Sequence, residues 1–354
     1  MQIGRMVICF NATTAAHEAL ARLQATGRYR DVSAVISTAL CNLEVLDLAT
    51  QASGGSVINP SAITAAFPIS PLERSNRTPE LLRQPKMPFE TDRFLAAPSP
   101  VTMPAELLPP KQWPWGQFNK VFPAKLTCRA TLNLLLQNPG IKITDAALSV
   151  TQSAAEIGGL LRTADEASHR RRDEAFAAAL PSNTDPADKS FIRFAEQFVY
   201  GVGSFSATSY PLMLRLVDGA GGNLRLTAAG VRFAEMTNPL LDGNLVQSAD
   251  KFSDAELSFL HEHIRSAVPA ESSALGAVLT AVKQGAVNPE AVDAFLRQLF
   301  PTASNELSDP FLATQRTGAI SRAVELKLLR RERNGVRVTY LLEPAAELFF
   351  QPLP

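Results

Sequence analysis

Basic side chains gather near the C-terminal end of the sequence. Residues 311–342 contain seven basic groups and only two acidic ones. Arginine can bind two phosphate oxygens at once, so such a cluster has the chemistry needed to hold a nucleic-acid backbone. The preceding segment, residues 246–310, has five more acidic than basic groups. The zero net charge of the chain is therefore a cancellation and does not exclude nucleic acid.

The other reactive residue types form no comparable pattern. His261 and His263 are two positions apart on an expected helix, so they point to different faces and make a poor metal pair. The three cysteines are far apart, which excludes a disulfide framework or a CxxC-type zinc site and fits a reducing cytoplasm. No nucleophile elbow, P-loop or dinucleotide-binding motif occurs between a strand and a helix. We expect no enzymatic activity, no metal and no cofactor.

A helix and a hairpin must position the arginine cluster. Apolar residues around Ile320 and Val324 predict a helix packed against a core. The Asn334-Gly335 pair is a strong signal for a two-residue hairpin turn. Val336, Val338 and Tyr340 then alternate, as on a half-buried return strand.

This stretch, residues 309–344, strongly resembles the recognition helix and wing of multiple-antibiotic-resistance-type winged-helix regulators. The junction between helix and hairpin is Leu326-Lys327-Leu328-Leu329. The resemblance implies a helix in the DNA major groove and a wing on phosphate or the minor groove. The expected contacts on or before the exposed helix face are Gln315, Arg316, Thr317, Ser321 and Arg322. Those on the wing are Arg330, Arg331, Arg333, Asn334 and Arg337. The alternative is a solvated wing in a domain that binds proteins.

A second wing-like pattern lies earlier, in residues 206–236. A helix leads into a strand at Leu214–Val217, a glycine-rich turn, a strand at Leu224–Leu226 and a helix capped by Thr227. This order resembles the wing of many bacterial winged-helix proteins. Its turn has no arginine or lysine, which favours protein contacts. The run Arg170–Arg172 is flanked by acidic residues and is interpreted as a solvated helical face.

The N-terminal block predicts a strand, a helix, a turn and a second helix within about 45 residues. So small a unit cannot bury its own apolar faces and needs a partner. The segment GRYRDVSAVISTALCNLEVL (27–46) resembles the second helix of ribbon-helix-helix repressors, which implies a homodimer through residues 5–46. Arg5 and Asn11 would face outward from the ribbon, and amides near Ser33 would hold a phosphate. The block is neutral overall, so dimerisation without DNA contact is the alternative.

A proline-rich segment separates the N-terminal block from the rest of the chain, because 12 of the 25 prolines fall within residues 60–114. We predict a mainly α protein of four parts. These are a ribbon-helix-helix-like module (1–50), a proline-rich linker or docked arm (51–112), and two winged-helix-like domains (113–245 and 246–354). The aromatic residues Trp113, Trp115, Phe118 and Phe122 are expected to anchor a core or dock the arm.

We interpret the chain as a cytoplasmic, bacterial-type protein that binds double-stranded DNA. No apolar run is long enough to predict a membrane span. The first hypothesis is a dimeric, sequence-specific transcriptional regulator. The alternative is a structural or DNA-loading subunit of a multi-protein complex, for chromosome or plasmid partition or for defence against mobile elements. In that case, the winged helices would contact other protein subunits.

Overall fold

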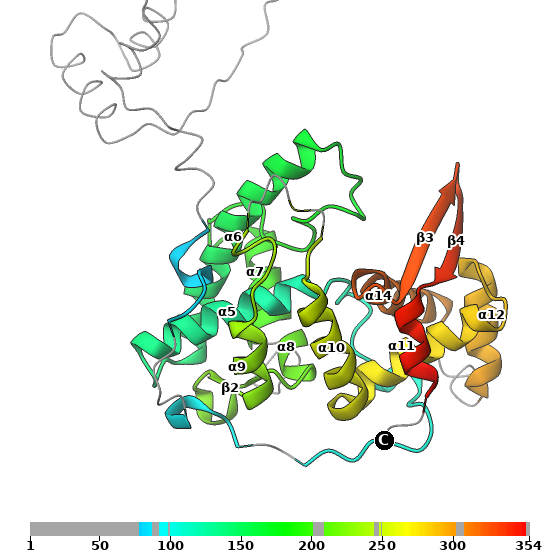
Figure 1. The fold of residues 1–354 in the computed structure, drawn as a ribbon, viewed down its shortest axis with the longest axis horizontal. Helices are drawn as coiled ribbons and strands as arrows, with labels where there is room; N and C mark the ends of the chain where they lie inside the picture. The colour runs from blue at the N-terminus through cyan, green and yellow to red at the C-terminus, as the bar shows by residue number, and fades with distance from the viewer. Residues whose placement is uncertain are drawn as a thin grey trace, which may run out of the picture. The chain divides into compact units, whose positions relative to one another are not determined.

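The computed structural model describes residues 78–86, 92–97, 100–200, 209–243, 248, 250–301 and 308–351. The predicted ribbon module, with Arg5, Asn11 and Ser33, lies outside the described residues. Ser75–Pro354 form one compact unit. This unit is mainly helical and has two small antiparallel two-stranded sheets, which confirms the predicted mainly α class (Figure 1). None of the helices in these ranges has the length and apolar character needed to span a membrane.

The first half of the unit is built around α5 (Phe122–Gln137), most of whose side chains are buried. The sequence predicts this helix over residues 125–136; it begins earlier because Pro123 suits a first helical turn. The long helix α6 (Ile143–Ala167) packs against it. The remaining elements are α7 (Lys189–Ala195), a π-helical turn η4 (Glu196–Tyr200), α8 (Tyr210–Met213), β1 (Val217–Asp218), η5 (Ala220–Gly222), β2 (Arg225–Leu226) and α9 (Ala228–Glu235).

The predicted strand pair forms, but its first strand lies later than the predicted Leu214–Val217, because residues 214–216 form a turn in which Arg215 takes a φ of 57°. Strands β1 and β2 pair antiparallel, with Val217 opposite Leu226. Thr227 caps α9 as expected, since its hydroxyl accepts the Gly230 N–H at 3.0 Å. A described part of the proline-rich region lies along β2, where the Ala96 N–H donates to the Leu226 carbonyl at 2.7 Å.

The second half begins with α10 (Asp254–Ala267). The sequence Ser253-Asp254-Ala255-Glu256 predicts a capping box at its start, and the structure contains it. The helices α11 (Pro269–Lys283), α12 (Pro289–Leu299) and α14 (Asp309–Glu325) follow.

The predicted Asn-Gly hairpin forms between β3 (Leu329–Asn334) and β4 (Arg337–Leu342), before the 3-10 helix η6 (Pro344–Phe350). Asn334 pairs with Arg337, so the two loop residues are Gly335 and Val336 rather than Asn334 and Gly335. Gly335 takes a φ of 61°, and a positive φ at the first loop residue is what a type II′ hairpin turn requires. Val336 therefore lies in the turn and not on the return strand, where the sequence predicts it.

Buried polar contacts join the two halves across the predicted boundary at residue 245. Lys125 on α5 pairs with Glu256 on α10 at 2.8 Å, and neither side chain is exposed. The Tyr210 hydroxyl on α8 donates to Glu271 on α11 at 3.3 Å. A segment that we call the strap, residues 113–121, runs between the halves. Its Phe118 is fully buried and lies against the Tyr210 ring, with centroids 5.6 Å apart.

Candidate nucleic-acid interface

The β3–β4 hairpin projects from the body of the unit (Figure 1). Its six residue pairs run from Leu329–Leu342 at the base to Asn334–Arg337 at the tip. Only the base is buried, so the charged outer part of the hairpin is free of the core. At the tip, Val336 is 99% exposed. Arg337 has no hydrogen bond or ion pair with any residue that the structure describes. The hairpin therefore offers a narrow, cationic projection to a partner.

The arginines of β3 divide between the two faces of the hairpin, because successive side chains of a strand alternate. Arg331 and Arg333 both reach Asp173, at 3.3 and 2.6 Å. Arg330 lies on the other face, between Glu332 at 3.0 Å and Glu343 at 3.3 Å. Its side chain is 60% exposed, so these pairs are solvated and weak.

Two of the predicted DNA contacts on α14 are inside the protein. The sequence predicts Gln315 and Arg322 on an exposed helix face, and this placement is wrong. Gln315 is 3% exposed; it donates to the Pro110 carbonyl at 2.8 Å and accepts the Gly116 N–H. Arg322 is fully buried and pairs with Glu271 at 2.7 Å. The strap covers this side of the helix, which a prediction based on helical spacing alone could not reveal.

The other three predicted residues of α14 offer little for base recognition. Arg316 is half-buried, and its Nε lies 2.9 Å from an Asp293 carboxylate oxygen. Ser321 accepts a hydrogen bond from Arg331 at 3.4 Å. Thr317 is exposed, but its hydroxyl donates to the carbonyl of Ala313 in the same helix at 2.7 Å. The helix therefore presents no long, free polar side chain that could bind a base edge in two places.

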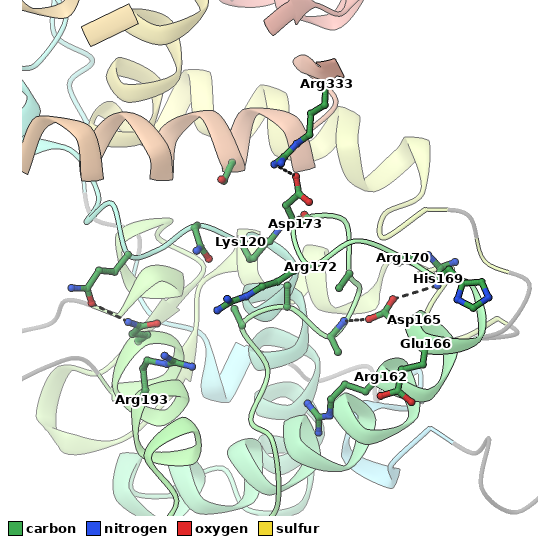
Figure 2. Close-up of a pocket in the computed structure, with 18 residues that line it drawn as sticks. Lys120, Arg162, Asp165, Glu166, His169, Arg170, Arg172, Asp173, Arg193 and Arg333 are labelled. Atoms are coloured by element: carbon green, nitrogen blue, oxygen red, sulfur yellow. Dashed lines mark hydrogen bonds and ion pairs between the residues drawn. The ribbon is translucent and has the colours of Figure 1, made fainter. Parts of the chain in front are cut away.

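A cavity of about 1230 Å³, which we call the cleft, lies beside the hairpin. Figure 2 shows that its labelled cations come from separate segments around one space. Six lysine or arginine side chains line it, against three carboxylates, one of which is Asp173. The cations are Lys120 from the strap, Arg162 from α6, Arg170 and Arg172 from the loop after α6, Arg193 from α7, and Arg333 from β3. The cleft and the hairpin share Arg333 and so form one continuous basic surface.

The cleft could not be predicted from the sequence, because the run Arg170–Arg172 looks like a helical face. That assignment is wrong, since α6 ends at Ala167 and the three arginines lie in a connecting loop, residues 168–174. Arg170 is held by Asp165 at 3.3 Å and stacks on Phe176 at 3.9 Å from the ring centroid. The run of three arginines was the available signal, but only the fold brings them near Lys120 and Arg193.

Two charged groups at the cleft have perturbed proton affinities. Lys120 is 9% exposed, and burial lowers the pKa of its ammonium to about 8. Partial burial opposes the charge of Asp173. The pKa of the Asp173 carboxyl is nevertheless below its ordinary value, because main-chain hydrogen bonding and the positive charges of Arg333 and Arg331 stabilise the carboxylate. Asp173 is therefore an anion already held in place by two hairpin arginines.

The histidines of α10 make separate contacts with main-chain carbonyls. His261 Nε2 lies 2.8 Å from the Leu326 oxygen, and His263 Nε2 lies 2.8 Å from the Leu214 oxygen. Burial lowers the pKa of both rings. Within the described ranges, no group of three or more histidine, cysteine, aspartate or glutamate residues is arranged to hold a metal ion.

Comparisons of the chain with protein-family models, curated proteins and solved structures give no match.

Proposed function

We propose that this chain is a non-enzymatic protein that binds double-stranded DNA, mainly through phosphate contacts of the β3–β4 hairpin. The observation that carries the proposal is the contrast between this hairpin and the helix before it. Arg330, Arg333, Asn334 and Arg337 are exposed on a projecting element, whereas Gln315 and Arg322 are buried. Phosphate contacts position a protein on DNA but carry no sequence information directly.

This contrast favours the structural or DNA-loading subunit over the sequence-specific regulator. A regulator needs side chains that reach base edges, and α14 has few to offer. A subunit of a partition or defence complex needs tight binding to the DNA sugar-phosphate backbone and surfaces that contact other proteins. The uncharged β1–β2 turn suits such protein contacts, since its tip consists of Ala220, Gly221 and Gly222.

The finer features expected from the sequence belong to the same proposal. We interpret the order helix, strand, turn, strand in each half as a winged-helix-like arrangement. Homodimerisation through residues 5–46 would double the number of hairpins available to one DNA molecule. We also retain a cytoplasmic location, which the scarcity of cysteine fits, and a bacterial type, which the resemblance to bacterial winged-helix regulators implies.

Fluorescence anisotropy with two unrelated 30-base-pair duplexes tests the proposal. Wild-type protein should bind both with similar affinity. The Arg333→Gln/Arg337→Gln variant should weaken both equally. Its slope of log affinity against log salt should fall by about 1.8, roughly 0.9 for each phosphate that is no longer neutralised. The control Arg83→Gln/Arg232→Gln removes the same charge at exposed positions elsewhere and should leave the slope unchanged.

Two outcomes would contradict the proposal in different ways. If wild-type protein binds neither duplex at low salt, DNA binding is wrong. If genomic selection instead yields one sequence bound at least a thousandfold more tightly than unrelated DNA, the regulator is correct and the subunit is not.

A further inference from the structure

The cleft carries positive charge that its own carboxylates do not neutralise. Asp165 accepts the main-chain N–H groups of Phe176 and Ala177, both at 2.9 Å, and also pairs with Arg170. Asp173 is held by Arg331 and Arg333. The third carboxylate, Glu166, interacts electrostatically with Arg162. None of the three acids forms an ion pair with Lys120, Arg172 or Arg193.

These three cations are available to a ligand. Among the described residues, Arg172 and Arg193 have no hydrogen-bond or ion-pair partner, and both are exposed to the cleft. Lys120 is buried in the wall, and its ammonium donates to one neutral acceptor, the Asp173 carbonyl, at 2.8 Å. The carboxylates of Glu325 and Asp173 attract this ammonium, but it forms no ion pair with a described residue, and burial still opposes its charge. An anionic ligand in the cleft would therefore stabilise it.

The rest of the lining suits a compact anion rather than a nucleic-acid strand. The amides of Gln117, Asn119 and Gln197 face the same cavity and can donate to oxygen atoms. Single-stranded nucleic acid is usually held by bases stacked on aromatic rings. Among the described residues that line the cleft there is no phenylalanine, tyrosine or tryptophan, and His169 is the only aromatic ring. The cations instead surround a concave space from the strap, α7 and the loop after α6 (Figure 2).

We propose that the cleft binds a compact polyphosphate group, with Lys120, Arg172 and Arg193 as its contacting cations. Inorganic polyphosphate and nucleoside triphosphates share this chemistry, and either is a possible source. Cations from three segments that line one cavity can each donate to phosphate oxygens, and such charge-assisted bonds are short and strong. This activity is separate from the DNA binding proposed above and does not depend on it.

Calorimetric titration of the full chain with inorganic tripolyphosphate and with ATP tests the proposal. We expect one ligand per chain. Removing one charge-assisted bond should weaken binding at least tenfold. The variant Arg172→Gln/Arg193→Gln should therefore weaken it at least a hundredfold. Arg171→Gln is the matched control, because Arg171 adjoins Arg172 but does not line the cleft; it should change affinity less than twofold.

The outcomes separate the possible ligands from one another. Equal binding of tripolyphosphate and ATP supports the proposal and means that the phosphates alone are recognised, whereas tighter binding of ATP supports it with a nucleotide as the source. The proposal is wrong if wild-type protein binds neither, or if the double variant binds as well as the control. It is also wrong if a 20-nucleotide single strand binds wild-type protein more tightly than the double variant while tripolyphosphate does not bind. Arg337→Gln should weaken DNA binding but leave tripolyphosphate binding unchanged. The DNA-binding proposal and the polyphosphate proposal are therefore tested independently.

Discussion

Replacing Arg322 with methionine should destabilise the protein rather than weaken a direct contact with DNA. The guanidinium lies fully buried between three elements of the unit. Its Nε pairs with Glu271 on α11 at 2.7 Å, and its Nη1 donates to the Phe118 carbonyl of the strap. Burial opposes its charge, yet Glu271 and Tyr210 raise the pKa of Arg322 above its ordinary value. The side chain is therefore charged in the folded protein.

The expected cost follows from what the substitution leaves behind. Methionine would fill much of the space but would leave the Glu271 carboxylate buried without its cation. Breaking a buried ion pair from one side costs about 3–5 kcal/mol. The variant Arg322→Met/Glu271→Gln removes the unpaired charge and keeps an acceptor for the Tyr210 hydroxyl. We expect it to recover about half of that stability.

Urea unfolding measures this difference. With a denaturant slope of about 3 kcal/mol per molar, the midpoint should fall by about 1–1.7 M in Arg322→Met. Tryptophan fluorescence suits the assay because both tryptophans, Trp113 and Trp115, lie in the strap. Circular dichroism should follow the same curve if unfolding is two-state. The reasoning fails if the midpoint stays within about 0.2 M of wild type while DNA affinity falls, since Arg322 would then be a DNA contact.

Two further predictions concern close packing and acid stability. Gly318→Ala should destabilise by about 1–3 kcal/mol in thermal unfolding, because the added Cβ overlaps the Gly116 main chain; Gly159→Ala, which meets nothing within 4 Å on α6, should stabilise by up to about 1 kcal/mol. Burial would raise the pKa of Glu325, but Lys251, 2.8 Å away, helps to hold that pKa below the ordinary value of 4.5. The stabilisation that the Glu325 carboxylate contributes is therefore complete above pH 4.5 and is lost as the pH falls. The free energy of unfolding of Glu325→Gln should therefore be lower at pH 7 and should fall less steeply below pH 4.5, and an identical acid profile in both proteins would contradict this.

Local signals in the sequence correctly predicted much of the secondary structure. The capping box at Ser253 and Glu256 begins α10, and the Thr227 cap begins α9. The glycine of the Asn334-Gly335 pair begins the two-residue turn that closes the hairpin. Each signal involves only a few adjacent residues whose hydrogen bonds or backbone angles decide the outcome. For that reason, these predictions needed no knowledge of the surrounding fold.

The sequence predicted less well which basic residues are free. Lys125, Arg129 and Arg322 are charged residues of helices, yet all three are fully buried. Arg129 meets Asp242 through two hydrogen bonds of 2.8 and 2.9 Å, although 113 positions separate them. Arg172 is exposed, as the sequence predicts, but it lies in a loop and lines the cleft, which its acidic neighbours in the sequence did not indicate. Charge counting along the chain cannot separate these cases.

The sequence by itself determined that the chain is mainly helical, where many of its elements begin, and that positive charge gathers in residues 311–342. Those properties depend on neighbouring residues, so they can be inferred from short windows. Only the tertiary structure decided that α14 is covered by the strap, that the hairpin projects, and that Lys120, Arg172 and Arg193 surround one cavity. Burial and ion pairing depend on partners brought together from distant parts of the chain, and those partners decide whether a charge stabilises the core or remains free to bind.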